Sequence, residues 1–385
     1  MIHALLLVAT MQRWLLVNDV HLDPFGDEPT LYHETDTSPK LWRSTVNAMR
    51  AELGDARVVI VGGDLLAHHW DSLARHAGAD PTVAALETER GIVEDLSAAF
   101  PRAQFLFALG NNDDPCGDYR SETGGPYLKA LASAFAPLVR RNGAAPAFET
   151  EFERGGYYEA RLPNGERAIV LDSVFWSFIY GGACQSNATG AGASELAWFD
   201  ARLSHLPRGK RAIVLMHIPP GYDGASTAMT GAVWPIPFLH ASDNAALLAT
   251  FARYRKRIGF ALAAHTHHFG RRSPGGVSMI VGSSISPVNH VTPAFYELDI
   301  AADGSLARTI PFGYDAVSET WRRADLLEFA QRGLANECTR EHLDGGYARC
   351  VGTQRRLVVA VLSMLLGLGA IAAAIALRLR RKRRA

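Results

Sequence analysis

Residues 57–64 read Arg-Val-Val-Ile-Val-Gly-Gly-Asp, an unbroken apolar run that stops at two glycines and a carboxylate. A run without polar alternation is typical of a strand that is buried on both faces of a sheet. Four further apolar runs also end at Asp, Asn or His, and they lie at 14–19, 104–113, 211–217 and 260–265. Because parallel strands of an α/β sheet present their carboxyl ends on one edge, we expect these polar clusters to converge on one rim.

Helical patterns separate several of these runs, at 39–53, 81–99, 194–206 and 243–254. Strands that alternate with helices predict an α/β layered fold. A second and more antiparallel sheet is predicted by β-rich segments without helices between them, at 156–162, 168–171, 277–281 and 294–300. Residues 317–334 have an amphipathic helical pattern, and with the segment around Cys338 and Cys350 they predict a small helical appendage.

The composition of the 385 residues is that of a globular protein, with 48% apolar and 20% charged residues. These values exclude a wholly disordered chain, a collagen and a coiled coil. Six of the 39 basic residues lie in the last eight positions, which leaves 33 basic against 39 acidic residues in the rest of the chain. A mildly acidic body lacks the basic surface that binds the phosphates of DNA or RNA, so we expect no nucleic-acid partner.

The C-terminal part contains a run of 21 residues without a charge, at 357–377. As a helix this run is about 31 Å long, which matches the hydrocarbon core of a bilayer, so we predict one transmembrane helix. A basic tail follows at 378–385, and the positive-inside bias places that tail in the cytoplasm and the body outside. Residues 1–10 are a weak export signal because no basic region precedes their apolar stretch, so a tail-anchored protein with a cytoplasmic body is the alternative.

The chain has four cysteines. Four cysteines allow three pairings, and we expect Cys338 with Cys350, which lie close together in the sequence, and Cys116 with Cys184. Disulfides form in oxidising compartments, so this pairing goes with a body outside the cytoplasm. Four reduced thiols are the alternative.

The polar clusters at the strand ends contain the residue types of a metal site. They are, in chain order, Asp19, His21, Asp64, Asn111, His217, His265 and His267. Residues i and i+2 of an extended chain point to the same side, so Asp19 and His21 can hold one ion together. Asp64 has two carboxylate oxygens and follows two glycines, so it can bridge two ions.

Imidazole, carboxylate and amide ligands together favour Zn, Mn or Fe over calcium. We therefore predict two divalent metal ions as cofactors, about 3.5–4 Å apart. Such a pair clamps both sides of an in-line displacement at phosphorus and holds a bridging hydroxide as the nucleophile.

The order of these motifs resembles that of the calcineurin-like metallophosphoesterases. The motifs read Asp-Val-His at 19–21, Gly-Gly-Asp at 62–64, Gly-Asn-Asn at 110–112, Met-His at 216–217 and Ala-His-Thr-His-His at 264–268. Within that family, residues 63–70 and 286–299 resemble the acid sphingomyelinase-like phosphodiesterase branch, the former reading Gly-Asp-Leu-Leu-Ala-His-His-Trp. The resemblance covers residues 13–350.

The resemblance implies a four-layer α/β sandwich of two mixed β-sheets flanked by helices. With the patterns above, it gives a catalytic domain at 1–310, a helical appendage at 311–356, the transmembrane helix at 357–377 and a basic cytoplasmic tail at 378–385. It also implies the ligand sets. One ion takes Asp19, His21 and His267, the other takes Asn111, His217 and His265, and Asp64 is shared.

The chain departs from the family at Asn112, where the family usually has a histidine that stabilises phosphate charge or protonates the leaving oxygen. An asparagine amide can hydrogen-bond a phosphoryl oxygen but cannot deliver a proton. His68 follows Asp64 by four residues, so one helical turn would place both on one side. We therefore predict catalytic roles for His68, as the general acid, and for Asn112. A loop histidine without a catalytic role is the alternative for His68.

The predicted function is hydrolysis of P–O bonds by a two-metal phosphodiesterase of the acid sphingomyelinase-like type. The substrate is expected to be a phosphodiester or a polyphosphate, either a small molecule or a lipid, and the C-terminal helix would hold the enzyme at a membrane. The alternatives are a polyphosphate or nucleotide pyrophosphate hydrolase and a phosphomonoesterase of the same fold. A non-catalytic scaffold is a further alternative, but such proteins typically lose metal ligands and all seven are present here.

Overall fold

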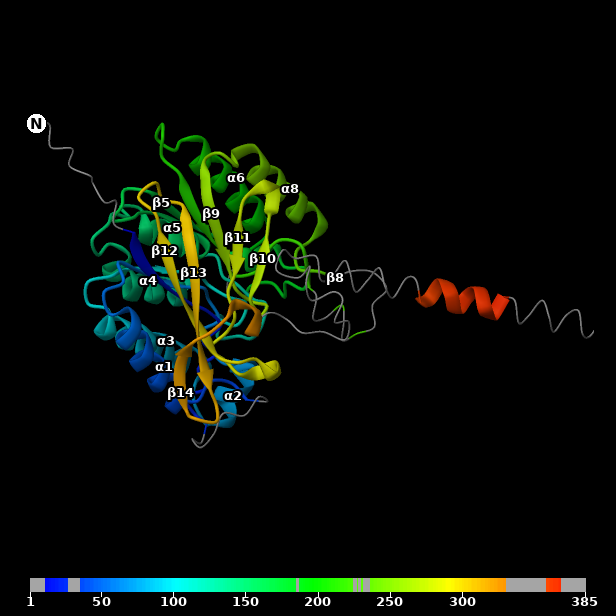
Figure 1. Ribbon diagram of the computed structural model, residues 1–385, viewed down its shortest axis with the longest axis horizontal. Coiled ribbons are helices and arrows are strands. Elements are labelled where there is room, and N and C mark those ends of the chain that lie inside the picture. Colours follow the sequence, from blue (N-terminus) through cyan, green and yellow to red (C-terminus); the bar gives the residue numbers. More distant parts are fainter. Residues whose placement is uncertain are drawn as a thin grey trace, which may run out of the picture.

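The computed structural model describes residues 11–26, 35–184, 187–223, 227, 230, 236–329 and 358–367. Two six-stranded β-sheets make up its centre (Figure 1). The first has the order β14-β13-β12-β1-β2-β3. Its parallel strands are β1 (Gln12–Val17), β2 (Val58–Val61) and β3 (Gln104–Phe107), and its antiparallel strands are β12 (Ala294–Ile300), β13 (Leu306–Asp315) and β14 (Thr320–Arg323).

The second sheet has the order β10-β11-β9-β6-β5-β4 and is also mixed. Parallel pairs join β5 (Arg167–Val170), β6 (Ala212–Leu215), β9 (Ile258–Ala263) and β11 (Met279–Val281). The two edges are antiparallel, with β10 (Gly270–Arg272) on β11 and β4 (Tyr158–Arg161) on β5. A separate short pair is formed by β7 (Tyr222–Asp223) and β8 (Ile236–Pro237).

Helices connect the parallel strands. They are α1 (Pro39–Leu53), α2 (Trp70–His76), α3 (Pro81–Ala99), α4 (Gly125–Val139), α5 (Phe148–Gly155), α6 (Ala191–Ser204) and α8 (Ala241–Tyr254). The helices predicted at 39–53 and 81–99 are α1 and α3, with the observed bounds. In the structure a capping residue and a proline mark the start of each. The Ser38 hydroxyl accepts a hydrogen bond from the Leu41 amide, and the Asp80 carboxylate accepts from two amides of the first turn of α3. The predictions at 194–206 and 243–254 correspond to α6 and α8.

Alternate residues of the second sheet enter two different cores. Ile213 and Leu215 of β6 share the large core between the sheets with Trp14 of β1. Val214, which lies between them, shares the other core with Phe199 of α6 and apolar residues of α8. Because side chains along a strand alternate between faces, this sheet is covered by the first sheet on one side and by α6 and α8 on the other (Figure 1). The predicted α/β sandwich of two mixed sheets flanked by helices is confirmed.

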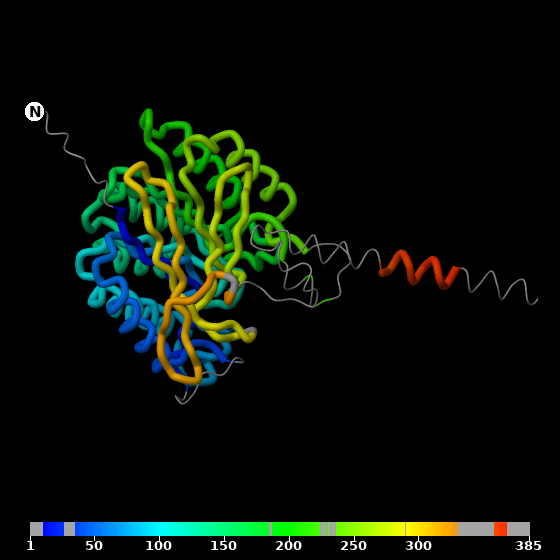
Figure 2. Tube along the Cα trace, viewed as in Figure 1, coloured from blue at the N-terminus to red at the C-terminus, as the bar shows by residue number. Residues whose placement is uncertain are grey.

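The prediction of a second, more antiparallel sheet holds only in part. The predicted strands at 156–162, 168–171 and 277–281 are β4, β5 and β11, which lie in the second sheet with β6 and β9. The strand predicted at 294–300 is β12, which pairs with β1 in the first sheet (Figure 2). A β-rich segment shows that a strand forms, but its partner is set by packing between residues far apart in the sequence.

The helix predicted at 317–334 is also wrong where the structure describes it. Residues Thr320–Arg323 form β14, which pairs with β13, and a short 3-10 turn follows at Leu326–Glu328. Trp321 explains the strand, since its ring packs on Phe295 with centroids 5.1 Å apart and its indole nitrogen donates to the Ser44 hydroxyl. The predicted boundary at 310/311 falls within β13, and residues 330–356, with Cys338 and Cys350, lie outside the described residues.

Within the predicted span at 357–377, the structure describes a helix at 358–367. Among the residues that the structure describes, no helix has both the length and the apolar character needed to cross a bilayer. The rest of the span and the tail at 378–385 lie outside the described residues.

Candidate metal centre

The predicted ligands lie in five loops, each of which follows the carboxyl end of a parallel strand. The loops after β1, β2 and β3 come from the first sheet, and those after β6 and β9 come from the second. Backbone hydrogen bonds hold the loops against one another. The Asp19 amide donates to the Gly63 carbonyl at 3.0 Å, and the Ala264 amide donates to the His217 carbonyl at 2.9 Å. The expected rim therefore exists, at the edge where the two sheets meet.

One cluster contains Asp19, His21, Asp64 and His267, all of them buried. The Nε2 atoms of His21 and His267 are 3.1 Å apart, and His21 Nε2 is 3.3 Å from Asp64 Oδ2. Their candidate ligand atoms all lie within 4.8 Å of one another. This is the set that the family resemblance implies for one ion.

A second cluster lies on the other side of Asp64. It contains Asp64, His217 and His265, and Asn111 adjoins it. His217 Nε2 is 3.1 Å from Asp64 Oδ2 and 3.1 Å from Asn111 Oδ1. The same oxygen, Asp64 Oδ2, therefore faces a histidine of each cluster, so the structure brings all seven predicted residues together with Asp64 in the middle.

The donor atoms fit divalent cations. His21 Nδ1 is 3.0 Å from the Leu66 carbonyl and His217 Nδ1 is 2.8 Å from the Gly62 carbonyl. A carbonyl can only accept, so each Nδ1 carries a hydrogen, and Nε2 is the ring nitrogen that faces the centre and would bind a metal ion. Asp19 Oδ2 and His267 Nδ1 are buried without a hydrogen-bond partner among the described residues. Bonds of about 2.1 Å to a shared ion would place ligand atoms about 3.0–3.4 Å apart, as they are here.

Burial and neighbouring charges shift the pKa values of the predicted ligands. Burial raises the pKa of Asp19 to about 8 and lowers the pKa of His21 to about 4. Burial also lowers the pKa of His265, to about 3. Burial opposes the charged form of His217 as well, but the charge and hydrogen bond of Asp64 and the charge of Asp19 together outweigh burial and raise the pKa of His217 to about 9. Neutral imidazoles are ready ligands, and the protons that Asp19 and His217 hold are those that a metal ion displaces.

Five of the seven side chains lie on strained backbone. The φ angles are 46° at Asp19, 43° at His21, 55° at Asp64, 70° at His265 and 56° at His267. This left-handed region is unfavourable for residues with a Cβ, by about 1–3 kcal/mol each, and is held only where the surroundings impose it. Such strain gathers at functional sites, because it lets consecutive residues turn their side chains to one point.

Two known proteins are similar to parts of this chain. No family model matches the chain. It is 23% identical over 278 residues to a sphingomyelinase phosphodiesterase C of Dictyostelium discoideum, over 68% of this chain and 57% of that protein. It is 25% identical over 198 residues to an endopolyphosphatase of Schizosaccharomyces pombe, over 49% of this chain and 33% of that protein. The chain thus spans about half and a third of the lengths of these relatives.

Its resemblance to the calcineurin-like metallophosphoesterases is confirmed. The sphingomyelinase-like branch is also supported by the first of these relatives. A solved structure, a dimetal phosphatase from Danio rerio, is 16% identical with a TM-score of 0.48, over 81% of this chain and 98% of that one.

A further buried acid, Asp113, holds the loops around Asp64. Its carboxylate accepts hydrogen bonds from the amides of Asp64 at 2.8 Å, Gly110 at 2.7 Å and Leu65 at 2.6 Å. Asp113 therefore ties the loop after β3 to the loop that contains Asp64. Gly110 is required beside it, because a Cβ there would overlap Asp64 Oδ1.

Asn112, in the position where the metallophosphoesterases usually have a histidine, contacts the shared carboxylate. Its side-chain amide donates to Asp64 Oδ2 at 2.9 Å and its backbone amide donates to Asp64 Oδ1 at 2.8 Å. The side chain is buried, and its Oδ1 has no hydrogen-bond partner among the described residues.

His68 lies at the edge of the first cluster, where its ring stacks on His21 with centroids 4.0 Å apart. The carboxylate of Asp36 holds it, with Oδ1 2.8 Å from His68 Nδ1 and Oδ2 accepting from the His68 amide at 2.7 Å. Burial lowers the pKa of His68, but the hydrogen bond and the charge of Asp36 outweigh burial and raise it. The neighbouring His69 points away, with 82% of its side chain exposed. Sequence reasoning missed Asp36, because no strand precedes it and no metal-site spacing marks it.

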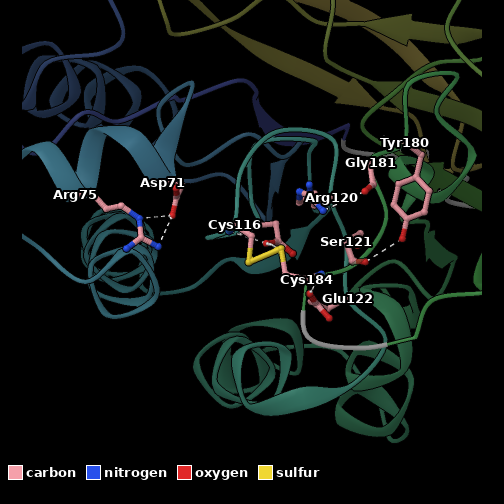
Figure 3. Close-up of a disulfide and its surroundings, with 10 residues drawn as sticks. Asp71, Arg75, Cys116, Arg120, Ser121, Glu122, Tyr180, Gly181 and Cys184 are labelled. Carbon is pink, nitrogen blue, oxygen red and sulfur yellow. Dashed lines mark hydrogen bonds and ion pairs between the residues drawn. A yellow bond between two sulfur atoms is a disulfide. The ribbon is translucent and has the colours of Figure 1, made fainter.

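A disulfide joins Cys116 to Cys184 (Figure 3). It links the loop that follows Asn111 to the loop at 181–184, in agreement with the predicted pairing. Between the two, the Tyr119 amide donates to the Asn111 carbonyl at 2.6 Å and the Gly181 amide donates to the Tyr119 carbonyl at 2.7 Å. The Tyr119 ring meets His265 edge-on, with centroids 5.9 Å apart. The disulfide therefore fixes the polypeptide that surrounds two of the predicted ligands.

Proposed function

We propose that the protein is a dinuclear metal-dependent phosphoesterase, and that it is a phosphodiesterase of the acid sphingomyelinase-like type. The observation that carries the proposal is the position of Asp64 Oδ2, 3.3 Å from His21 Nε2 in one cluster and 3.1 Å from His217 Nε2 in the other. A carboxylate shared in this way is the ligand that two adjacent ions require. The sphingomyelinase and endopolyphosphatase relatives support phosphoric ester or anhydride hydrolysis.

The proposed ligand sets are those of the two clusters. Asp19, His21 and His267 would hold one ion, Asn111, His217 and His265 would hold the other, and Asp64 would bridge them. When bound, divalent Zn, Mn or Fe ions supply positive charge for the phosphoryl oxygens and a water that is acidic enough to react at neutral pH. The chain supplies the burial that keeps these charges strong and a fixed ligand geometry.

We propose His68 as the residue that protonates the leaving oxygen. Asp36 fixes His68 Nδ1, which leaves Nε2 as the atom that can deliver a proton to a substrate at the first cluster. With 30% of its side chain exposed, His68 can both meet substrate and regain its proton from solvent. Asn112 is proposed to act on the shared carboxylate, since its amide donates to Asp64 Oδ2 and keeps that carboxylate oriented.

A second candidate function is hydrolysis of polyphosphate or of a nucleotide pyrophosphate, which the similarity to an endopolyphosphatase favours. A phosphomonoesterase uses the same centre and is the third candidate. A non-catalytic scaffold is less favoured, because the structure brings together all seven residues that metal binding needs.

Turnover by the purified full chain tests these candidates. With Mn or Zn added, we expect bis-p-nitrophenyl phosphate to be hydrolysed faster than p-nitrophenyl phosphate. The rates with sphingomyelin and with polyphosphate then show which class of natural substrate the enzyme prefers. The Asp64→Asn variant is the control for activity from a contaminant. Bound metal without turnover of any of these four compounds would overturn the enzyme proposal in favour of a scaffold.

We further propose that residues 357–377 anchor the protein in a membrane and that its body faces an oxidising, extracytoplasmic compartment. The Cys116–Cys184 disulfide supports the second part, because reducing conditions in the cytoplasm oppose such bonds. A reporter fused after Ala385 tests it, since we expect that reporter to be cytoplasmic. A reporter exposed on the same side as the body would contradict a membrane-spanning anchor.

A further inference from the structure

A cavity of about 430 Å³ lies far from the metal centre, between the carboxyl ends of two helices. Its lining consists of Ser204, Arg253, Tyr254, Arg255, Lys256 and Arg257. Ser204 ends α6, Tyr254 ends α8, and the three basic residues after it lead into β9. We call this feature the basic cavity. Its volume is within the range of small-molecule sites.

The basic cavity carries a surplus of positive charge. Of its four cations, Arg253 is paired, with Nη1 2.5 Å from Asp200 Oδ1. The Tyr254 hydroxyl donates to the other oxygen of Asp200. Arg255, Lys256 and Arg257 form no ion pair with an acid among the described residues. This surplus is unusual in a chain whose body, without the tail, has more acidic than basic residues.

Helix capping explains only part of this charge. Arg257 Nη1 donates to the carbonyls of Leu203 and Ser204, both at 2.9 Å, and so satisfies the end of α6. Arg255 donates to the Ala252 carbonyl of α8 with one of its five N–H groups. Lys256 forms no hydrogen bond to another described residue. An ammonium group and most of a guanidinium group therefore remain available to a ligand.

We propose that the basic cavity is an anion site that binds a free oligophosphate. Guanidinium groups bind phosphate oxygens through paired N–H donors, and an ammonium group adds a point charge. The Arg255–Lys256–Arg257 run supplies both kinds, and the Ser204 hydroxyl is a further polar group of the lining. A ligand with several phosphates suits the site best, because three cations without acidic partners line one cavity.

This site is separate from the metal centre. The basic run that lines the cavity comes directly before β9, which begins at Ile258. His265 and His267 come after the other end of β9, which ends at Ala263. The six residues of β9 span about 20 Å. An anion in the basic cavity therefore cannot contact the predicted metal ligands, and binding there is expected with or without metal.

Calorimetric titration of the metal-free full chain with tripolyphosphate, at low salt, tests the proposal. We expect the Arg255→Gln, Lys256→Gln double variant to bind about tenfold or more weakly than the wild type, because it loses two charged donors. The matched control is the Arg50→Gln, Arg90→Gln double variant, which removes two exposed charges from α1 and α3 and should bind as the wild type does. Wild-type affinity in the first variant, or an equal loss in the control, would overturn the proposal.

Two measurements keep the test interpretable. Arg257 is left unchanged because it donates to the carbonyls at the end of α6. The melting temperature of the double variant is measured as well. If it is lower than that of the wild type, the Lys256→Gln single variant is used instead. Binding to vesicles of phosphatidylcholine with phosphatidic acid tests whether a lipid headgroup, rather than a free oligophosphate, is the ligand. We expect the Arg255→Gln, Lys256→Gln double variant and the Lys256→Gln single variant to bind these vesicles as the wild type does. Loss of vesicle binding with unchanged tripolyphosphate binding would overturn the proposal of a free oligophosphate.

Discussion

The two sides of the metal centre use similar ligands but have different neighbours. His21, on the first side, stacks on His68, which is held by the carboxylate of Asp36. His265, on the second side, meets the edges of Tyr119 and Phe238 at centroid distances of 5.9 and 5.4 Å. A histidine–carboxylate pair therefore lies beside one cluster and an aromatic wall beside the other. The comparison teaches that two similar ligand sets can have unlike surroundings, and the proposed proton donor belongs to the first side alone.

The largest expected effect comes from the residue that both sides share. The Asp64→Asn variant loses the charge that faces His21 and His217 together, so we expect turnover to fall by about three orders of magnitude or more. Metal analysis should show fewer than two ions per chain. Asp55→Asn, at an exposed carboxylate, is the control. Two bound ions in the Asp64 variant would contradict the shared role.

The next effect should be confined to the first side. We expect His68→Ala to lower turnover of diesters with alkyl leaving groups by about 10²–10⁴-fold, because their alkoxides need a proton. The loss of turnover with a p-nitrophenyl leaving group should be much smaller, because p-nitrophenolate departs without being protonated. Steady-state rates with both ester types measure the difference. Equal losses of turnover for the two ester types would show that His68 is not the proton donor. The proposed difference between the two sides would then be wrong.

A smaller effect of the same kind is expected from Asp36→Asn. The amide keeps the shape of the side chain but loses the charge that fixes the His68 ring, so a loss of about 10–100-fold is expected with alkyl leaving groups. This loss should appear in kcat rather than in KM. The Ser286→Ala variant, which removes a 3.2 Å hydrogen bond to Asp36, is the milder companion. A loss in KM alone would mean that Asp36 serves substrate binding instead.

The smallest effect on chemistry should come from the second side. Replacing Cys116 and Cys184 with serine frees a loop of 68 residues, and we expect a loss of about 2–4 kcal/mol of stability. Thermal unfolding measures it. Turnover should fall modestly and equally for alkyl and p-nitrophenyl esters, because Tyr119 and Asn111 lose support but no proton donor is removed. A loss that depends on the leaving group would contradict the division between the sides.

Much of the centre could be predicted from the sequence because each ligand follows an apolar strand. The runs that end at Asp19, Asp64 and His217 give the strands, and the layered fold brings their ends together. Asp36 could not be found in this way, since it lies in a loop before α1 and reaches His68 only through tertiary packing. The pairing of β12 with β1 was unpredictable for the same reason, because strand partners are chosen by contacts across 280 or more residues.

The dispersal of the ligands along the chain has a consequence for biosynthesis. Four of them, from Asp19 to Asn111, are made early, and three, from His217 to His267, are made only after the second sheet has begun. The loops after β1 and β2 already hold each other through the Asp19 amide and the Gly63 carbonyl, but neither proposed ligand set is complete before the second sheet is made. The proposed centre would therefore bind its two ions only after His267 has been synthesised.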